Sequence, residues 1–217
     1  MASRPLRLET KWSLVAGFSA CLAGAAAPAL GAAGDPAAGE SQALVCAACH
    51  GQDGATGLDP TYPNLAGQNE RYLLTQLTAI RDGSRDVPLM AGQLTTKSDQ
   101  DLEDLAAYYA SLPGKVGQAQ GDDDTLAQAE GIYRGGIAAK GVAACTACHS
   151  PSGNGNTPAG YPHIGGQASG YVIAQLTAYR EGTRTTDEDY GGMMRGVAQG
   201  LTDKEIAALA DYIHGLH

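Results

Sequence analysis

The 217-residue chain has few large apolar side chains. Its one tryptophan, Trp12, and its one phenylalanine, Phe18, both lie near the N-terminus, so tyrosine is the only large aromatic residue in the remainder. Small domains of this composition bury little apolar surface by themselves. They usually need a bound group or a cross-link to complete the core.

Long apolar runs are also missing, except at the start of the chain. Three basic residues open the sequence, and an apolar stretch from about residue 12 to residue 30 ends at small residues. This pattern is typical of an export signal, so we predict that residues 1–33 are a signal peptide. Cys21 then belongs to the signal and not to a lipid-modified start. No later stretch reaches the ~20 apolar residues of a membrane span. The pattern predicts a soluble periplasmic protein and leaves membrane association open.

Positive charge is scarce. The chain has 14 basic and 23 acidic residues; residues 1–33 hold three of the former and one of the latter, which leaves 11 and 22 and a net charge of −11. Such a surface repels nucleic acid and anionic membrane, so we predict no nucleic-acid partner. It favours a protein partner with a basic docking patch.

Against this sparse background, one pentapeptide occurs twice. Residues 46–50 are Cys-Ala-Ala-Cys-His, and residues 145–149 are Cys-Thr-Ala-Cys-His. The first copy holds Cys46, Cys49 and His50, and the second holds Cys145, Cys148 and His149. C-x-x-C-H is the attachment signal of c-type haem. Two residues between the thiols match the spacing of two porphyrin vinyl groups, and the adjacent imidazole then lies beneath the iron. The sequence therefore predicts two covalent haem c groups, with His50 and His149 as iron ligands.

Other interpretations of the cysteines fit less well. Structural zinc pairs usually lie ~15–20 residues apart, whereas nearly a hundred residues separate these two. A thioredoxin-like pair would need a strand beside it, and the local sequence offers none. Disulfides are common in exported proteins, but they would not require a histidine after each pair.

The two halves are copies of one unit. At an offset of 99, Tyr62-Pro63 matches Tyr161-Pro162 and Gly67-Gln68 matches Gly166-Gln167; after Arg184 the offset becomes 104. We predict an all-α fold with domains at residues 34–113 and 125–217. Residues 114–124, rich in Gly, Gln and Asp, are predicted to be a linker, and the Asp122-Asp123-Asp124 run a solvated part of it.

Helical periodicity and capping patterns recur in both copies. Middle helices are predicted over residues 70–81 and 169–180. Ser98 and Thr202 have the spacing of capping boxes ahead of the closing helices. Opening helices are predicted to begin near Asp35 and near Thr125.

Methionine is the natural second axial ligand. Met90 is the sole candidate in the first half, whereas Met193 and Met194 compete in the second. Only Met194 shares with Met90 the position eight residues before the helix cap, so we predict Met90 and Met194. Methionine–histidine coordination is the pattern of electron carriers. Three further histidines have no counterpart in the first half and are interpreted as surface or satisfied polar residues: His163, His214 and His217.

Supporting residues follow from the same alignment. A metal-bound histidine normally donates its outer N–H to a carbonyl or carboxylate, and Pro63 and Pro162 offer carbonyls. Repeated arginines are candidates to pair with haem propionates, although solvated helix-end charges are an equal alternative: Arg81, Arg85, Arg180 and Arg184. Repeated tyrosines are candidates to pack on the porphyrins: Tyr62, Tyr72, Tyr161 and Tyr171.

Together these motifs resemble the dihaem cytochrome c4 family over essentially the whole mature sequence. The resemblance implies two class I cytochrome c domains related by a pseudo-twofold axis, with their haem propionate edges facing each other. It also implies a periplasmic protein that passes electrons toward a haem–copper terminal oxidase. The sequence departs from the repeat in having Met193 beside Met194, and Ala91 where the second copy has Arg195.

Three hypotheses follow. The first is an electron carrier, not an enzyme, between a respiratory donor such as a quinol-oxidising complex and a haem–copper oxidase. The second is the dihaem electron-accepting subunit of a larger dehydrogenase, such as a sulfide-oxidising flavocytochrome c. The third, a dihaem peroxidase, needs an iron with an open position, and the presence of both Met90 and Met194 argues against it.

Overall fold

The computed structural model describes residues 34–217, so the predicted signal peptide and Cys21 lie outside the described residues. Both halves of the repeat belong to one compact unit, residues 32–217. Residues 34–217 form helices joined by loops, with two isolated β-bridges and no β-strand. The predicted all-α fold class is confirmed.

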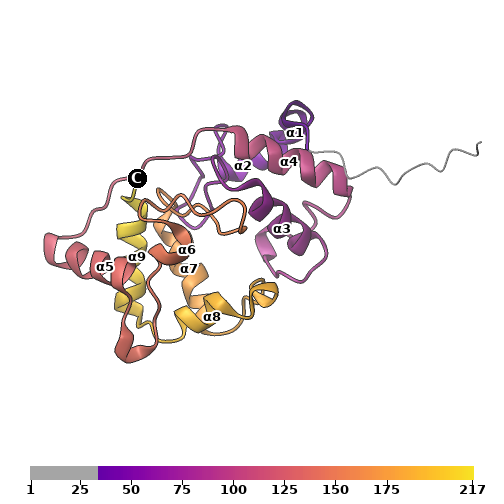
Figure 1. The fold of residues 1–217 in the computed structure, drawn as a ribbon. Helices are drawn as coiled ribbons and strands as arrows, with labels where there is room; N and C mark the ends of the chain where they lie inside the picture. Colours follow the sequence, from indigo (N-terminus) through magenta and orange to yellow (C-terminus); the bar gives the residue numbers. More distant parts are fainter. Residues whose placement is uncertain (1–33) are drawn as a thin grey trace, which may run out of the picture. The chain divides into compact units, whose positions relative to one another are not determined.

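The first half builds its helices around the closing helix α4. Its elements are α1 (Pro36–Gln42), α2 (Leu44–His50), α3 (Glu70–Arg81), the 3-10 turn η1 (Pro88–Met90) and α4 (Asp99–Ser111). Helices α1 and α3 both pack against α4 (Figure 1). Asp35 is the N-cap of α1. Its side chain accepts a hydrogen bond from the Ala37 amide (2.9 Å), and a proline occupies the first helical position.

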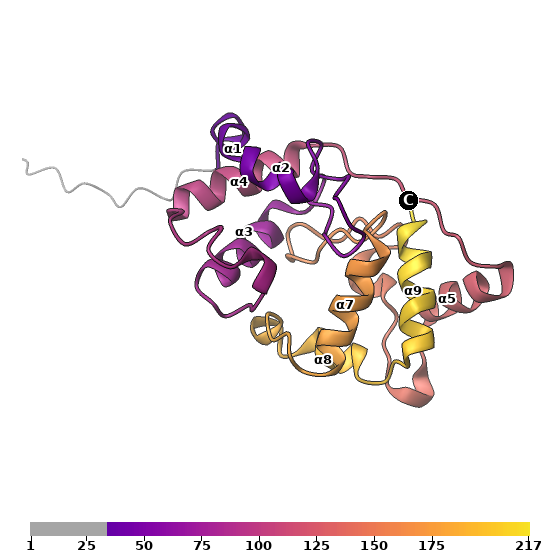
Figure 2. The same ribbon diagram turned by 180° about the vertical axis from the view of Figure 1, so that it is seen from behind.

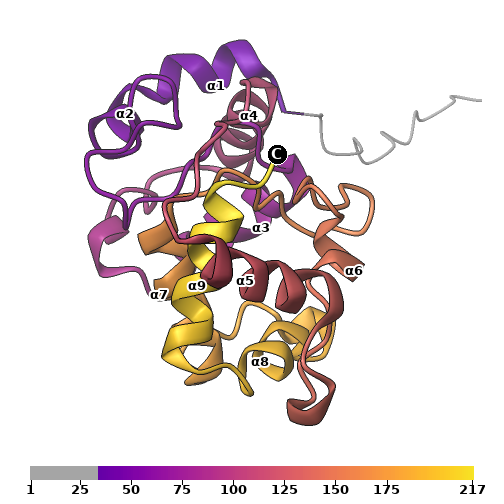
Figure 3. The same ribbon diagram turned by 90° about the vertical axis from the view of Figure 1, so that its left-hand side faces the viewer.

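The second half repeats this plan with one more α-helix and one more 3-10 turn. Its elements are α5 (Asp123–Gly135), η2 (Ala138–Lys140), α6 (Thr146–His149), α7 (Ser169–Arg180), η3 (Glu188–Tyr190), α8 (Met193–Ala198) and α9 (Asp203–His214). Helices α5 and α7 pack on α9, and α8 packs on α7 (Figure 2). Figure 3 shows α5 crossing α9. Helix α8 has no counterpart in the first half. It follows the five residues that the second copy has gained, where the offset between the copies changes from 99 to 104.

The predicted helices and caps are found in the structure. The middle helices α3 and α7 span residues 70–81 and 169–180. Both capping boxes are complete: the side chains of Ser98 and Thr202 accept from the third helical amide, and the acidic residue at that position accepts from the cap amide. Substituting such a cap costs about 1 kcal/mol, so each box fixes where the closing helix begins.

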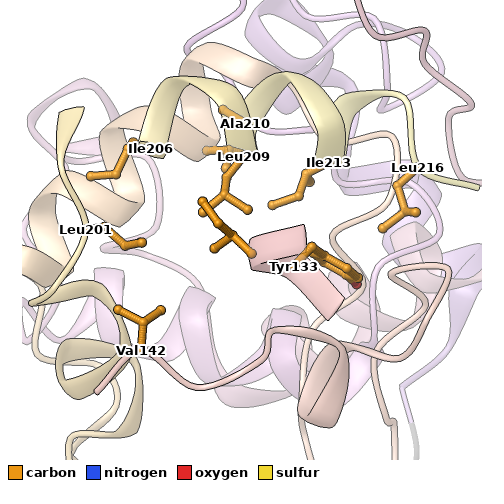
Figure 4. Packing of buried hydrophobic residues seen from close by; sticks show 10 residues of the cluster. Tyr133, Val142, Leu201, Ile206, Leu209, Ala210, Ile213 and Leu216 are labelled. Atoms are coloured by element: carbon orange, nitrogen blue, oxygen red, sulfur yellow. The ribbon is translucent and has the colours of Figure 1, made fainter. Parts of the chain in front are cut away.

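Each half has its own small apolar core. The core of the second half is formed mainly by α9 and α5, with these residues labelled in Figure 4: Tyr133, Val142, Leu201, Ile206, Leu209, Ala210, Ile213 and Leu216. The smaller core of the first half holds Ala43, Leu73, Leu105, Ala106 and Tyr109. Both cores contain small residues and a tyrosine, as expected for domains that are completed by a bound group.

The segment predicted as a linker is held against the folded halves. Its Gln120 and Gly121 amides donate to the Asp211 carboxylate of α9. A Cβ on Gly67 would meet the backbone of Gly114, and one on Gly166 would meet the carbonyl of Lys115. Both glycines of the repeated Gly-Gln pairs therefore let the linker backbone approach closely.

The expected start of the opening helix near Thr125 was two residues late. Helix α5 begins at Asp123, because the Asp122 side chain accepts from the Thr125 amide (2.8 Å) and caps it. Asp123 and Asp124 lie in the first turn, where carboxylates interact favourably with the helix dipole. The acidic run is exposed to solvent, as predicted, but its last two residues are the start of α5 and Asp122 is the helix cap.

No helix within residues 34–217 is long and apolar enough to cross a bilayer.

Candidate haem sites

Each C-x-x-C-H motif lies on a short helix. Cys46 and Cys49 are on α2, and Cys148 is on α6, with Cys145 at its N-terminus. Residues three apart on a helix share one face, so both thiols of each pair are presented side by side. All four cysteines are free thiols and partly buried. Among residues 34–217, no three His, Cys, Asp or Glu side chains gather into a metal-binding cluster.

The two motif histidines are buried and oriented in the same way. His50 is 5% exposed and His149 is 7% exposed. His50 Nδ1 lies 3.0 Å from the Pro63 carbonyl oxygen, and His149 Nδ1 lies 3.0 Å from that of Pro162. A carbonyl only accepts, so each Nδ1 carries the proton and each Nε2 keeps its lone pair. The predicted carbonyl partners are confirmed.

Burial also sets the charge of these imidazoles. It lowers the pKa of both His50 and His149, and the hydrogen bonds to Pro63 and Pro162 oppose this only in part. Both rings are therefore neutral at pH 7. A neutral imidazole with a free Nε2 is the form that binds a metal.

The first thiol of each attachment motif is shifted toward its protonated form by burial. Burial raises the pKa of Cys46, and it raises the pKa of Cys145 to about 11. Both sulfurs lie beside apolar core residues. This environment suits a thioether better than a thiolate.

The chain turns sharply after each histidine. Gly51 (φ 83°, ψ 157°) and Ser150 (φ 68°, ψ 164°) occupy a conformation that is essentially restricted to glycine. Ser150 is the only non-glycine residue with positive φ among residues 34–217. Its carbonyl accepts a hydrogen bond from the Tyr133 hydroxyl (2.7 Å), which holds the turn in place.

The candidate methionines lie on different local structures. Met90 ends the 3-10 turn η1, whereas Met193 and Met194 are the first two residues of α8. Met90 and Met194 are partly buried, and Met193 is 39% exposed. The Met193 sulfur lies 4.0 Å from Cys148 Sγ.

The repeated arginines divide into two kinds. Arg81 and Arg180 pair with acidic residues at the start of the closing helices, Asp99 and Asp203, at 2.7 Å each. Their interpretation as helix-end charges fits these contacts. Arg85 and Arg184 instead reach across to the other half, where Arg85 donates to the Tyr171 hydroxyl and Arg184 to the Tyr72 hydroxyl.

The remaining sequence candidates all contact other groups of the protein. The Tyr62 ring meets the His50 ring edge to face at a centroid distance of 6.0 Å, and Tyr161 packs on Tyr190. The three unmatched histidines are satisfied by backbone carbonyls, as interpreted: His163 by Gly67, His214 by Gln167, and His217 by Gly215.

Two glutamines join the halves, a role that the sequence did not predict. Gln68 accepts from the amide of His163 (2.8 Å) and donates to its carbonyl (2.7 Å). Gln167 does the same with Asn64, at 2.7 Å and 3.0 Å. Positions 64 and 163 are equivalents, so the two contacts are reciprocal. The repeated Gly-Gln pair could have indicated these contacts, because a glutamine that is buried in both copies needs a hydrogen-bond partner.

The donor set of each half fits haem c. Each half has two thiols on one helical face, a buried neutral imidazole with a free Nε2, and at least one thioether side chain within the same half. Soft sulfur and imidazole donors are typical of haem iron in electron carriers.

Comparison with known proteins agrees with this assignment. A family profile described as Cytochrome c matches residues 36–113 and 137–217. The chain is 55% identical over 186 residues to cytochrome c4 of Pseudomonas aeruginosa, covering 86% of this chain and 90% of that one. It also resembles the crystal structure of reduced recombinant cytochrome c4 from Pseudomonas stutzeri, with a TM-score of 0.81, 50% identity, and coverage of 85% and 100%.

A more distant relative has a different description. The thiosulfate dehydrogenase electron acceptor of Stutzerimonas stutzeri is 33% identical over 174 residues, or 78% of each chain. The duplicated motifs, the all-α halves and these similarities lead to one assignment. The chain belongs to the cytochrome c4 family, whose members are electron carriers with two covalently attached haem c groups.

Proposed function

We propose that this protein is a periplasmic carrier of single electrons from a respiratory donor, such as a quinol-oxidising complex, to a haem–copper terminal oxidase. The observation that carries the proposal is the pair of buried neutral histidines, each with a methionine available in the same half. A histidine and a methionine would together hold each iron, which would leave no open position for a substrate.

Each residue has a defined task in this proposal. The four motif cysteines would attach the porphyrins, His50 and His149 would bind iron through Nε2, and Met90 and Met194 would each supply a thioether sulfur as the other ligand. When bound, each haem supplies an iron that gains and loses one electron. The Pro63 and Pro162 carbonyls fix the orientation and tautomer of the histidines, so the ligands do not rearrange when the charge changes.

We infer that Met194, and not Met193, is the ligand of the second half. Met194 lies eight residues before Thr202, as Met90 lies eight residues before Ser98. Met193 is more exposed, and its sulfur lies beside Cys148, which a porphyrin bond would occupy. Next to the attachment sulfur, the Met193 side chain would be poorly placed to bind the iron.

Charge supports a partner with a basic docking surface. Residues 34–113 hold 11 acidic and 4 basic residues, whereas residues 125–217 hold 8 and 6. The acidic excess therefore lies mainly on the first half. A complementary basic patch would accelerate encounter with a redox partner, and the rate would fall with ionic strength. The N-terminal export pattern and the two haem-attachment motifs favour the periplasm as the compartment.

A second candidate is the electron acceptor of a dehydrogenase. It is favoured by the relative described as a thiosulfate dehydrogenase electron acceptor, although at lower identity than the cytochrome c4 relatives. Purification of the protein from native membranes and periplasm, together with its partners, distinguishes the two candidate functions. A stoichiometric dehydrogenase partner would favour the second candidate, and reduction by a quinol-oxidising complex would favour the first.

The proposal is tested by spectroscopic redox titration of the exported protein. We expect two low-spin haems per chain, both with the methionine–iron charge-transfer band when oxidised. Met90→Leu and Met194→Leu should each remove half of that band, and Met193→Leu should leave it intact. Loss of the band in Met193→Leu would show that the register of the second half is wrong. A haem that turns over peroxide far faster than free haem would contradict a carrier.

A further inference from the structure

A buried carboxylate of α4 lies against the first residues of the described chain. The Asp104 side chain is 6% exposed, and its Oδ1 accepts from the backbone amide of Asp35 and from the Gln100 side chain, both at 2.8 Å. Both donors are neutral. Within residues 34–217, Asp104 forms no ion pair and its Oδ2 accepts no hydrogen bond. A buried carboxylate held only by neutral groups is unfavourable unless a cation joins it.

The backbone at residue 34 is packed against the same helix. A Cβ added to Gly34 would meet the carbonyl of Glu103, and one added to Gly39 would meet the carbonyl of Asp104. The two glycines therefore let the chain lie directly on α4. The next residue, Asp35, donates its amide to the Asp104 carboxylate, so residue 34 is held beside that carboxylate.

The Gly34 nitrogen is the atom that follows the predicted signal peptide, residues 1–33. Consecutive backbone nitrogens are at most about 3.7 Å apart, so this nitrogen lies within about 6.5 Å of Asp104 Oδ1. In the precursor it is a neutral amide. Hydrolysis of the peptide bond between residues 33 and 34 consumes one water and leaves a carboxylate on the released signal. It also turns the Gly34 nitrogen into a primary amine, which takes up a proton at neutral pH.

The second half has neither of these features. At the offset of 104, Asp104 corresponds to Ala208, which is 5% exposed. The opening helix of the second half, α5, follows the linker and not a processing site. The buried carboxylate therefore occurs in the copy of the repeat in which processing can create a cation.

We propose that removal of the signal peptide at Gly34 completes the fold of the first half, because the new α-ammonium group pairs with the Asp104 carboxylate. The proposal rests on the export that is part of the proposed function. Before processing, Asp104 has only neutral donors; after processing, a cation lies beside it and strengthens the packing of α1 on α4. The first half is therefore more stable in the processed protein than in the precursor.

The test measures how fast the α-amino group reacts with an acylating reagent at pH 7 in the exported dihaem protein. Only the unprotonated amine reacts, and pairing with Asp104 keeps the amine protonated. Asp104→Asn should therefore raise the rate on the order of tenfold. Asparagine keeps the Oδ1 acceptor for the Asp35 amide, so the variant retains this contact. Mass spectrometry of the N-terminal peptide gives both the processing site and the extent of labelling, apart from the lysines.

The matched control is the neighbouring carboxylate. Glu103→Gln removes an equal charge from α4 but leaves the group that contacts the Asp35 amide, so the rate should change by no more than about twofold. The titratable groups near the new amine are Asp35 on its own segment and Glu103, Asp104 and Tyr108 on α4. A larger effect of Glu103→Gln than of Asp104→Asn would contradict the assigned partner.

The stability of the first half provides an independent measurement. Pairing raises the pKa of the α-amino group above its unfolded value, so its contribution is complete below about pH 7.7 and is lost as the pH rises through the higher folded value. The difference in denaturation midpoint between the unmodified protein and Asp104→Asn should therefore shrink between about pH 8 and pH 9 and then stay constant. A merely structural role of Asp104 would give a difference that does not change over this range.

Two outcomes would overturn the proposal. One is an equal acylation rate in Asp104→Asn and the unmodified protein, and the other is a stability difference that is independent of pH. In both cases a processed chain still shows export, so the proposed function would stand. A chain recovered with residues 1–33 attached would instead contradict the export, so the two failures are distinguishable.

Discussion

In the first half Met90 ends a single 3-10 turn, whereas in the second half Met194 lies in a helix that is held by an ion pair. The Asp187 carboxylate, 3% exposed, accepts from Arg195 Nε at 2.8 Å and from the Arg195 amide at 2.9 Å. The first half has Ala91 at the position of Arg195 and so has no such pair. Two copies of one unit can therefore keep the same proposed ligand while holding it with different rigidity.

The difference follows from the five residues that the second copy has gained. They place Asp187 on the turn before η3, close enough to reach back to α8. Arg195 also pairs with Glu188 at 2.8 Å, which ties the inserted turn to the helix. On this basis the second half should lose methionine ligation later than the first when the protein is heated or made alkaline.

The largest effect is expected from Asp187→Asn. The substitution removes the negative charge that pairs with Arg195. We expect a loss of about 2–3 kcal/mol in the free energy of unfolding, which is less than for a fully buried pair because Arg195 still pairs with Glu188. Thermal melting followed at the methionine–iron band measures it. The two halves, which should melt in separate steps in the unmodified protein, should then melt together. Asp86→Asn in the first half is the exposed control and should change stability by less than about 0.5 kcal/mol. Separate steps persisting in Asp187→Asn would contradict the role of this pair.

The turn after His50 offers the second test. Gly51→Ala places a Cβ against the carbonyl oxygen of Thr56 in a backbone conformation that disfavours side chains. We expect a loss of about 2 kcal/mol, measured by chemical denaturation. Gly83→Ala is the matched control, because Gly83 also has positive φ (78°) but nothing lies within 4 Å of its added Cβ. Equal losses in the two variants would show that close packing at Gly51 contributes nothing.

Acid stability should differ between the two capping boxes. Glu205 accepts from Lys140 (2.7 Å) and from Thr202, and the Lys140 contact is the main reason that its pKa is lowered to about 2 from an ordinary 4.5. Its contribution is therefore complete above pH 4.5 and is lost as the pH falls through about 2. Glu205→Gln should cost about 1 kcal/mol at pH 7, a value reduced for solvent screening.

The control for this prediction is the other half. Asp101 caps in the same way, but it forms no ion pair, because the neighbouring Lys97 donates to Gln42. Asp101→Asn should therefore have a smaller effect at pH 7. Denaturation curves of Glu205→Gln and the unmodified protein should converge near pH 2. A constant difference between them across this range would contradict the assigned pKa.

The smallest effect should be a gain. Ser150 has the backbone conformation that Gly51 has in the first half, so Ser150→Gly should relieve strain of about 1–2 kcal/mol. The variant also loses the hydrogen bond from the Asn154 amide to Ser150 Oγ (2.9 Å), so we expect a net gain of about 1 kcal/mol in the second half. Differential scanning calorimetry can measure this change. Unaltered or lower stability would show that the Asn154 contact outweighs the strain.

Much of the fold followed from local sequence. The helices α3 and α7 and both capping boxes were predicted with their bounds or caps, because periodicity and capping depend on residues within a few positions of each other. The start of α5 was predicted two residues late, since three consecutive aspartates offer three capping positions and the structure has Asp122 as the cap. The contacts of Gln68 and Gln167 were not predicted, because their partners lie about a hundred residues away.

The sequence by itself determined the chemistry of attachment: paired thiols and a following histidine bind haem c wherever a helix presents them on one face. It also determined the number of haems, because the motif and its surroundings are duplicated. Only the tertiary structure decided that His50 and His149 are neutral donors, that Asp187 holds α8, and that Arg85 and Arg184 cross between the halves. These properties depend on burial and on contacts between residues distant in the chain, and neither is written in the spacing of a motif.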